Sequence, residues 1–202
     1  MHLIAEGLSA SRGGEAIFED VGFALGSGEA LVVTGANGAG KSTLLRVIAG
    51  LLPVTSGEVR LEGGGESFPS PASACHYLGH LNAMKPALTV GENLAFWQDF
   101  LGAPRLSLDA ALEAVGLDGL DHLPFGVLST GQKRRASIAR LLMSYRPVWL
   151  LDEPTSGLDT ASETRFTEVV KSHLAEGGIV VAATHLPLGL EGARTLRMEP
   201  RR

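Results

Sequence analysis

The sequence predicts an α/β protein built on a mostly parallel core sheet with helices on both faces. Two late segments, Val148–Leu151 and Ile179–Thr184, are apolar throughout, and a helical segment at Ala161–Ala175 lies between them. Apolar strands that alternate with helices are typical of a parallel sheet that is covered on both sides. A glycine-rich segment at 35–43 follows an apolar strand and opens a helix, which is the arrangement of a phosphate-binding loop.

The first part of the chain is expected to contain short strands followed by a helix. Ser27-Gly28 is a tight turn between two of the strands, and Pro53 stops the helix because it cannot continue the hydrogen-bond ladder. The glycines and prolines of residues 63–71 indicate a surface loop. The expected strands are His2–Leu8, Ile17–Leu25 and Glu29–Thr34, and the expected helix runs from Lys41 to about Leu52.

The middle of the chain, approximately residues 81–146, is expected to be a helical subdomain. Thr89 and Glu92 have the spacing of a capping box, so a helix begins there, and Trp97 on its inner face is expected to pack in the core. A second helix begins after Ser107. No linker interrupts the pattern, and we expect residues 1–202 to form a single domain.

The composition limits the possible partners of the chain. Its 202 residues carry a net charge of -5, which gives no electrostatic reason to expect nucleic acid as a partner. The single cysteine, Cys75, cannot form an internal disulfide. No signal peptide is expected, and no apolar stretch approaches the roughly 20 residues that cross a bilayer. If the protein works at a membrane, another subunit supplies the membrane part.

The glycine-rich segment has the spacing of a phosphate loop, with a glycine, four residues and then Gly-Lys-Ser. Its backbone N–H groups and the helix N-terminus can surround a phosphate group. Lys41 can reach the β- and γ-phosphates of a nucleotide, and the Ser42 hydroxyl can ligate Mg²⁺. The expected binding residues are Gly35, Ala36, Asn37, Gly38, Ala39, Gly40, Lys41, Ser42 and Thr43.

Two acidic residues, Asp152 and Glu153, follow the buried strand that begins at Val148. Such a pair is usually a solvated strand end. At the carboxyl end of a parallel strand, however, both carboxylates can face a phosphate loop. Asp152 is then expected to hold Mg²⁺ through water, and Glu153 to act as the general base that activates the attacking water.

Taken in order, the remaining motifs make the chain resemble the ABC ATPases. Ser129-Thr130-Gly131-Gln132 occupies the position of that family's signature, and Ser156–Asp159 resembles its D-loop. His185 resembles its switch histidine. The resemblance implies a P-loop NTPase fold of the ABC ATPase type, with a small antiparallel β subdomain and a helical subdomain.

The resemblance also implies how ATP and Mg²⁺ are bound. The signature of a second ATPase subunit would cover the γ-phosphate, so the active state would be an ATP-bound homodimer. Ser129, Thr130, Gly131, Gln132 and Asp159 would belong to the binding surface, and His185 would contact the γ-phosphate.

Three positions depart from the family pattern. Arg12 stands where the family usually has an aromatic residue that stacks on adenine, and its guanidinium can either stack on the base or remain solvated. Thr130 replaces a glycine of the signature, so a side chain is added beside the phosphate. His80 takes the place of a glutamine near the Mg²⁺ site; it can contact the metal or its water, or remain a non-catalytic loop histidine.

Within the family, the histidine at position 80 and the segment Thr184–Leu188 resemble the ATPase subunits of bacterial cytochrome c maturation complexes, the so-called haem exporters. This resemblance implies integral membrane partners, indirect handling of haem, and a peripheral position on the cytoplasmic face of the inner membrane. Two alternatives remain open at this point. The chain could serve an ABC transporter for a lipid, drug or peptide, or it could be a soluble ABC protein without a transport role.

Overall fold

The computed structural model describes residues 1–186 and 188–199, and these divide into two compact units. The first unit comprises residues 1–79, 146–154 and 171–202, and the second comprises residues 80–145 and 155–170. Pro187, which belongs to the segment compared above with cytochrome c maturation ATPases, lies outside the described residues.

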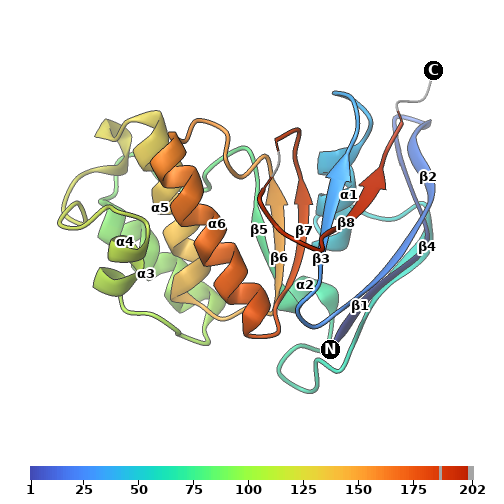
Figure 1. Cartoon of the computed structure of the whole chain (residues 1–202), viewed down its shortest axis with the longest axis horizontal. Helices are drawn as coiled ribbons and strands as arrows, with labels where there is room; N and C mark the ends of the chain where they lie inside the picture. Colours follow the sequence, from blue (N-terminus) through green and yellow to red (C-terminus); the bar gives the residue numbers. More distant parts are fainter. Residues whose placement is uncertain (187, 200–202) are drawn as a thin grey trace. The chain divides into compact units, whose positions relative to one another are not determined.

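The core of the first unit is a five-stranded sheet in the order β5-β6-β7-β3-β8 (Figure 1). Every neighbouring pair in it is parallel. Strands β6 and β7 are buried at every residue, as expected for apolar segments in the middle of a parallel sheet. The bounds are β3 Ala30–Thr34, β5 Cys75–Leu78, β6 Val148–Asp152, β7 Ile179–Ala183 and β8 Arg194–Arg197.

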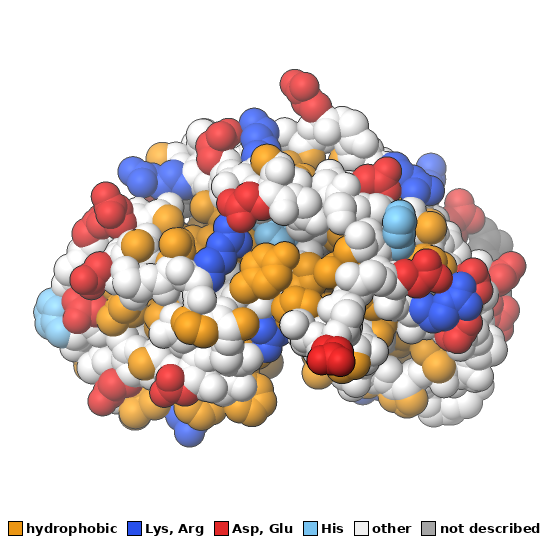
Figure 2. Space-filling view, turned by 90° about the horizontal axis from the view of Figure 1, so that it is seen from below, with side chains coloured by type: hydrophobic (Ala, Val, Ile, Leu, Met, Phe, Trp, Pro, Cys, Tyr) orange, Lys and Arg blue, Asp and Glu red, His pale blue; other side chains and the backbone are white. Residues whose placement is uncertain are grey.

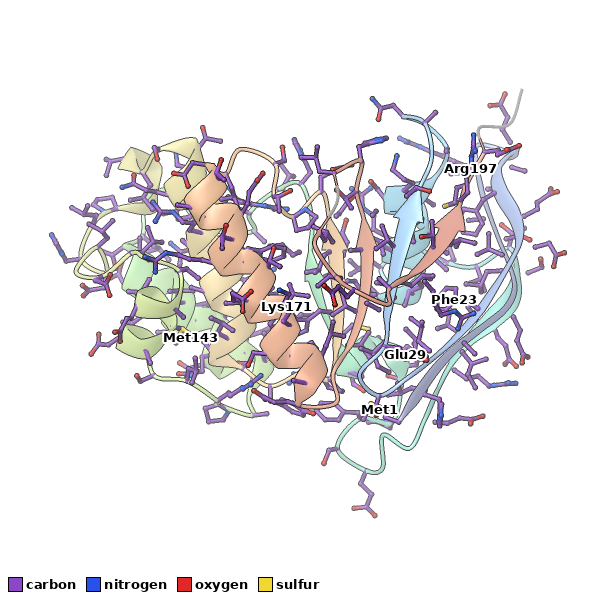
Figure 3. All side chains as sticks on the ribbon, viewed as in Figure 1. Met1, Phe23, Glu29, Met143, Lys171 and Arg197 are labelled. Atoms are coloured by element: carbon purple, nitrogen blue, oxygen red, sulfur yellow. The ribbon has the colours of Figure 1, made fainter. Side chains whose placement is uncertain are left out.

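A second, antiparallel sheet in the first unit has the strand order β2-β1-β4. Its strands are β1 His2–Arg12, β2 Glu15–Gly26 and β4 Ser56–Glu62. Strand β2 leads into the core sheet through a turn in which the Glu29 carboxylate accepts a hydrogen bond from the Gly26 N–H at 2.7 Å. Met1 lies at the same end of the unit (Figure 3), and its amino group donates to Ser27 Oγ at 3.2 Å.

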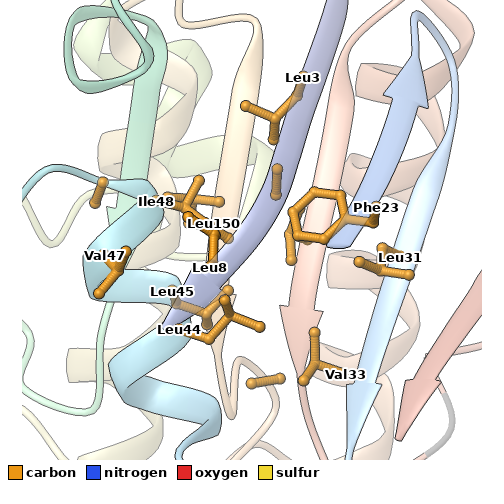
Figure 4. Packing of buried hydrophobic residues seen from close by; sticks show 14 of the residues in the cluster. Leu3, Leu8, Phe23, Leu31, Val33, Leu44, Leu45, Val47, Ile48 and Leu150 are labelled. Atoms are coloured by element: carbon orange, nitrogen blue, oxygen red, sulfur yellow. The ribbon is translucent and has the colours of Figure 1, made fainter. Parts of the chain in front are cut away.

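Helix α1, Lys41–Ile48, packs its apolar face into a core that both sheets of the first unit share. Leu44, Leu45 and Ile48 are essentially fully buried there, against residues of both sheets such as Leu8 and Leu150 (Figure 4). Burying a leucine or isoleucine side chain contributes about 1.5–3 kcal/mol, so this packing fixes the helix and the loop that precedes it. A single turn, α2 (Pro71–Ala74), precedes β5.

The second unit is helical. Its helices are α3 Val90–Leu101, α4 Leu108–Ala114 and α5 Thr130–Met143, with a 3₁₀ turn at Phe125–Val127, and α6 Thr160–Ala175 runs from this unit into the first. The predicted capping box of α3 is confirmed, because Thr89 Oγ1 accepts from the Glu92 N–H at 3.1 Å and Glu92 Oε2 accepts from the Thr89 N–H at 2.7 Å. Ser107 caps α4 as predicted.

Charged side chains of both signs are interspersed on the surface. Lysine and arginine lie among aspartate and glutamate on the face shown in Figure 2. Among residues 1–186 and 188–199, no helix combines the length and the hydropathy that crossing a bilayer requires.

The predicted fold class is confirmed, but several sequence-based details were wrong. The first helix ends at Ile48 and not near Leu52, because Gly50 adopts a positive φ of 70° and Leu51 N–H returns to the Arg46 carbonyl at 2.8 Å. Three strands, β4, β5 and β8, were not predicted.

Trp97 is another departure, since it is only half-buried and does not lie in the core. Its indole N–H donates to the Ala83 carbonyl at 2.8 Å, and the Arg140 guanidinium lies 4.6 Å from its ring centroid. The polar edge of the indole and the attraction between a cation and an aromatic face both favour this position at the border of the core.

Candidate functional site

The first unit contains a pocket of about 520 Å³ at the carboxyl end of the core sheet. Three parts of the chain form it: the hairpin between β1 and β2, the loop that leads into α1, and the end of β6. Its lining residues are Arg12, Glu15, Ala16, Ile17, Asn37, Gly38, Gly40, Lys41, Ser42, Thr43, Asp152 and Glu153.

The loop that leads from β3 into α1 depends on two glycines. Gly35 has a φ of 143°, and a Cβ there would lie 2.1 Å from the Met198 carbonyl oxygen. Gly40 has a φ of 92°, and a Cβ there would lie 2.8 Å from Ile17 Cγ2. Gly40 is also the N-cap of α1 and provides no side-chain acceptor, so the first N–H groups of α1 remain available for a bound anion.

Lys41 is 8% exposed, and its ammonium group is held inside this loop. Nζ donates to the carbonyl oxygens of Gly35 at 2.8 Å and Ala36 at 3.2 Å, and it lies 3.1 Å from His185 Nε2. A lysine positioned in this way presents its charge at the mouth of an anion-binding loop.

His185 lies close to both the phosphate loop and Glu153. Its Nε2 lies 3.0 Å from Asn37 Oδ1 and 3.6 Å from Glu153 Oε1. Nε2 accepts from Lys41 only when the ring proton is on Nδ1, and donates to Asn37 Oδ1 only when a proton is on Nε2. The imidazole therefore has two alternative sets of partners, and its tautomer selects between them.

Asp152 is the last residue of β6 and is 4% exposed. Its Oδ1 accepts a hydrogen bond from the Ser42 hydroxyl at 2.9 Å, and its Oδ2 accepts one from the Tyr77 hydroxyl at 3.2 Å. A carboxylate beside a serine hydroxyl at the mouth of a phosphate loop is the oxygen donor set that Mg²⁺ prefers. These residues therefore fit a bound Mg²⁺.

Glu153 has a strained backbone. Its φ is 45°, in the left-handed region that non-glycine residues rarely adopt, and its N–H donates to the Ala183 carbonyl at 2.8 Å. Such strain costs on the order of 1–3 kcal/mol and tends to persist at functional sites. The carboxylate lines the pocket and has a side chain that is 31% exposed.

The predicted signature segment lies in the second unit. Ser129 and Gln132 form a capping box at the start of α5: Ser129 Oγ accepts from the Gln132 N–H at 3.2 Å, and Gln132 Oε1 accepts from the Ser129 N–H at 2.9 Å. Thr130 is exposed and opens the helix. A Cβ on Gly131 would lie 3.2 Å from the Gly157 carbonyl oxygen, so the signature lies against the predicted D-loop.

Asp159 ends that D-loop and caps α6. Its Oδ1 accepts from the Ser162 N–H at 2.8 Å, and this hydrogen bond, together with one to the Ser162 side chain, lowers the pKa of the Asp159 carboxyl below its ordinary value. Asp159 therefore stays ionised at neutral pH and holds the start of α6.

The structure brings together the residues predicted for the phosphate loop, the carboxylate pair and the switch histidine, all of which belong to the first unit. Arg12 is exposed at one side of the same pocket. His80 is exposed and is the first residue of the second unit, so its predicted role at the metal stays a prediction. Sequence reasoning missed Tyr77 and Arg46, because it did not predict β5.

The fold and the pocket together define a nucleotide-binding protein of the ABC type. The sequence pattern of the ABC transporter family matches residues 18–156, and the chain belongs to this family. A solved structure described as the ATP-binding subunit of an ABC transporter has the same fold, with a TM-score of 0.86 at 23% identity over 100% of this chain and 89% of that one.

Closer relatives narrow the family. The chain is 68% identical to the "Cytochrome c biogenesis ATP-binding export protein CcmA" of Chelativorans sp. (strain BNC1), over 98% of both chains. It is 66% identical to the protein of the same name from Mesorhizobium japonicum, again over 98% of both. The predicted resemblance to the ATP-binding subunits of cytochrome c maturation is thereby confirmed, as are its class of ABC ATPase and ATP as its ligand.

Proposed function

We propose that the chain binds and hydrolyses ATP as the energy-supplying subunit of a membrane complex that serves cytochrome c maturation. The observation that carries this proposal is the pocket of the first unit, in which Lys41, Ser42, Asp152 and Glu153 surround one space. The relatives at 66–68% identity, which are named for cytochrome c biogenesis and export, support the biological role.

The phosphates of ATP bind at the loop 35–43, where N–H groups of the α1 N-terminus donate to the β-phosphate. Lys41 turns from the carbonyls of Gly35 and Ala36, its partners at 2.8 and 3.2 Å, to the β- and γ-phosphates. Ser42 and Asp152 would hold Mg²⁺, Asp152 through water, and the metal would supply neutralisation of the phosphate charge. His80 is proposed as a contact of that metal's water shell.

Hydrolysis transfers the γ-phosphoryl group to water. The water oxygen attacks γ-phosphorus, the bond to the bridging oxygen of ADP breaks, and Glu153 takes the proton of the attacking water. His185, 3.6 Å from Glu153 Oε1 through Nε2, donates to the γ-phosphate and holds the geometry of the water. Most of the rate enhancement then comes from positioning and from charge stabilisation.

A second copy of the chain completes the site. In one copy alone, the γ-phosphate would remain open to water. Ser129 and Thr130, exposed at the start of α5, offer a hydroxyl and helix N–H groups to the γ-phosphate of the nucleotide that the partner copy binds. Gln132 and Asp159 support that surface through their capping bonds. The Thr130 side chain, absent in the usual signature, extends towards the partner's nucleotide.

Arg12 is proposed to stack its guanidinium plane on the adenine ring. It lines the pocket as the last residue of β1. Because a cation over an aromatic face contributes about 0.5–2 kcal/mol, Arg12→Ala is expected to weaken ATP binding by roughly 2- to 30-fold. Calorimetric titration checks this, with Arg165→Ala, at an exposed arginine of α6 outside the pocket, as the matched control. Equal ATP affinities of Arg12→Ala and the native chain would contradict the stacking of Arg12 on adenine and favour a solvated side chain.

The complex is proposed to contain integral membrane subunits, with this chain bound peripherally at the cytoplasmic face of the bacterial inner membrane. Haem would be handled by those partners and affected by this chain only indirectly. The experiment is deletion of the gene in its own bacterium, which is expected to remove mature c-type cytochromes, seen as the loss of haem-stained bands. A plasmid carrying the native gene should restore them, whereas Glu153→Gln should not. Normal bands after deletion would contradict the role in cytochrome c maturation and leave the ATPase assignment standing.

A further inference from the structure

Two hydroxyl groups donate to the buried carboxylate of Asp152, one to each oxygen. Ser42 donates to Oδ1 at 2.9 Å and Tyr77 donates to Oδ2 at 3.2 Å. Ser42 belongs to the phosphate loop, but Tyr77 comes from β5, a strand parallel to β6 in which Tyr77 pairs with Leu150. A second element of the sheet therefore fixes the carboxylate beside the loop.

Arg46 fixes the direction of these hydrogen bonds. Its Nε donates to the Tyr77 hydroxyl oxygen at 3.1 Å. A guanidinium can only donate, so the phenol must use an oxygen lone pair for Arg46, and its one proton remains for Asp152. The chain of donors runs from Arg46 through Tyr77 to Asp152 Oδ2.

The phenol remains a donor at neutral pH. Burial raises the pKa of Tyr77 above its ordinary value, and the neighbouring Asp152 raises it further, whereas Arg46 opposes the shift. The net direction is upward, so the hydroxyl keeps its proton at neutral pH.

Gly79 provides a second, independent observation on the same contact. A Cβ at Gly79 would lie 2.8 Å from Tyr77 Cε1 and 3.1 Å from both Cζ and the hydroxyl oxygen. The tyrosine ring therefore rests against the backbone two residues further along, at a place that only glycine leaves open. The backbone at Gly79 therefore limits the positions that the Tyr77 ring can take.

We propose that Tyr77, supported by Arg46 and Gly79, is a positioning residue that orients Asp152 for Mg²⁺ bound with ATP. The proposal rests on the proposed function of the pocket. Tyr77 is not among the residues that line the pocket. Its hydrogen bond holds Oδ2, which would leave Oδ1, beside Ser42, as the oxygen offered to the metal's water. Groups that orient metal-binding side chains in this way commonly change metal affinity by 10- to 100-fold when they are removed.

The test compares nucleotide binding with and without a divalent ion. Mn²⁺ with ATP is titrated into each variant and followed by electron paramagnetic resonance, and ATP in EDTA is titrated by calorimetry. Tyr77→Phe is expected to weaken Mn²⁺ binding about 10- to 100-fold and to leave ATP affinity in EDTA within about 2-fold of the native value. Gly79→Ala should reproduce this pattern by displacing the ring. Tyr145→Phe removes the hydroxyl of the other tyrosine of the sequence and should change neither value.

Each result separates the alternatives. Native Mn²⁺ affinity in Tyr77→Phe would overturn the proposal, and so would an equal loss of affinity with Mn²⁺ and in EDTA, which would mark a structural role only. Arg46 is exposed, so Arg46→Met remains a valid test if Tyr77→Phe does not fold; it should weaken Mn²⁺ binding several-fold, and no change would overturn the proposal. If the native chain binds no ATP under either condition, the proposed function fails and takes this inference with it.

Discussion

Glu153→Gln is expected to lower ATP turnover by about 10²- to 10⁴-fold while ATP affinity stays within about 2-fold of the native value. The amide keeps the shape and the hydrogen-bonding size of the carboxylate, but it cannot take a proton from the attacking water. Because ATP then persists in the pocket, the variant should accumulate as an ATP-bound dimer. Release of phosphate measures the turnover, and light scattering after gel filtration with ATP and Mg²⁺ measures the dimer.

The control for this variant is Glu191→Gln, which removes an equal charge from an exposed position outside the pocket. It should retain native turnover and remain in the native distribution of oligomers. Turnover of Glu153→Gln within a few-fold of the native rate would contradict the assignment of Glu153 as the base and would leave its strained backbone, with φ 45°, without a catalytic explanation.

Lys41→Ala is expected to weaken ATP binding by roughly 10- to 150-fold, since a hydrogen bond from a charged donor contributes about 1.5–3 kcal/mol. The variant also leaves the Gly35 and Ala36 carbonyls without the ammonium that donates to them. The ATP affinity is measured by calorimetric titration with Mg²⁺ present.

Lys171→Ala is the matched control, because Lys171 is exposed on α6 in the first unit (Figure 3) and lies outside the pocket. It should bind ATP as the native chain does. Unchanged ATP affinity in Lys41→Ala would refute the interpretation of residues 35–43 as a phosphate loop.

The core sheet and the pocket followed from local signals in the sequence. An apolar run such as Val148–Leu151 is typical of a strand that is buried on both faces. The acids that follow it then lie at the carboxyl end of the parallel sheet, where the glycine-rich loop begins. The capping box at Thr89 needed only residues three positions apart. These features depend on short-range chemistry, which is why they were visible without a structure.

Other features depend on pairing between distant segments. Strand β8 is mostly exposed and carries no apolar pattern, and it is a strand because it pairs in parallel with β3. Strand β5 is four residues long and follows a glycine- and proline-rich loop, so its length gave no signal. The contact of Tyr77 with Asp152 depends on β5 and was missed for the same reason. The end of α1 depends on the positive φ of Gly50. The sequence prediction placed the end later because it took Pro53 as the stop signal.

The most direct test is phosphate release by the purified native chain, reconstituted with the membrane subunits proposed above and supplied with Mg²⁺ and ATP. We predict ATP hydrolysis that needs the divalent ion and the residues of one pocket, from the loop at 35–43 to Glu153. A second copy of the chain is expected to cover the γ-phosphate. A complex that is correctly assembled and yet neither retains nor cleaves ATP would contradict it.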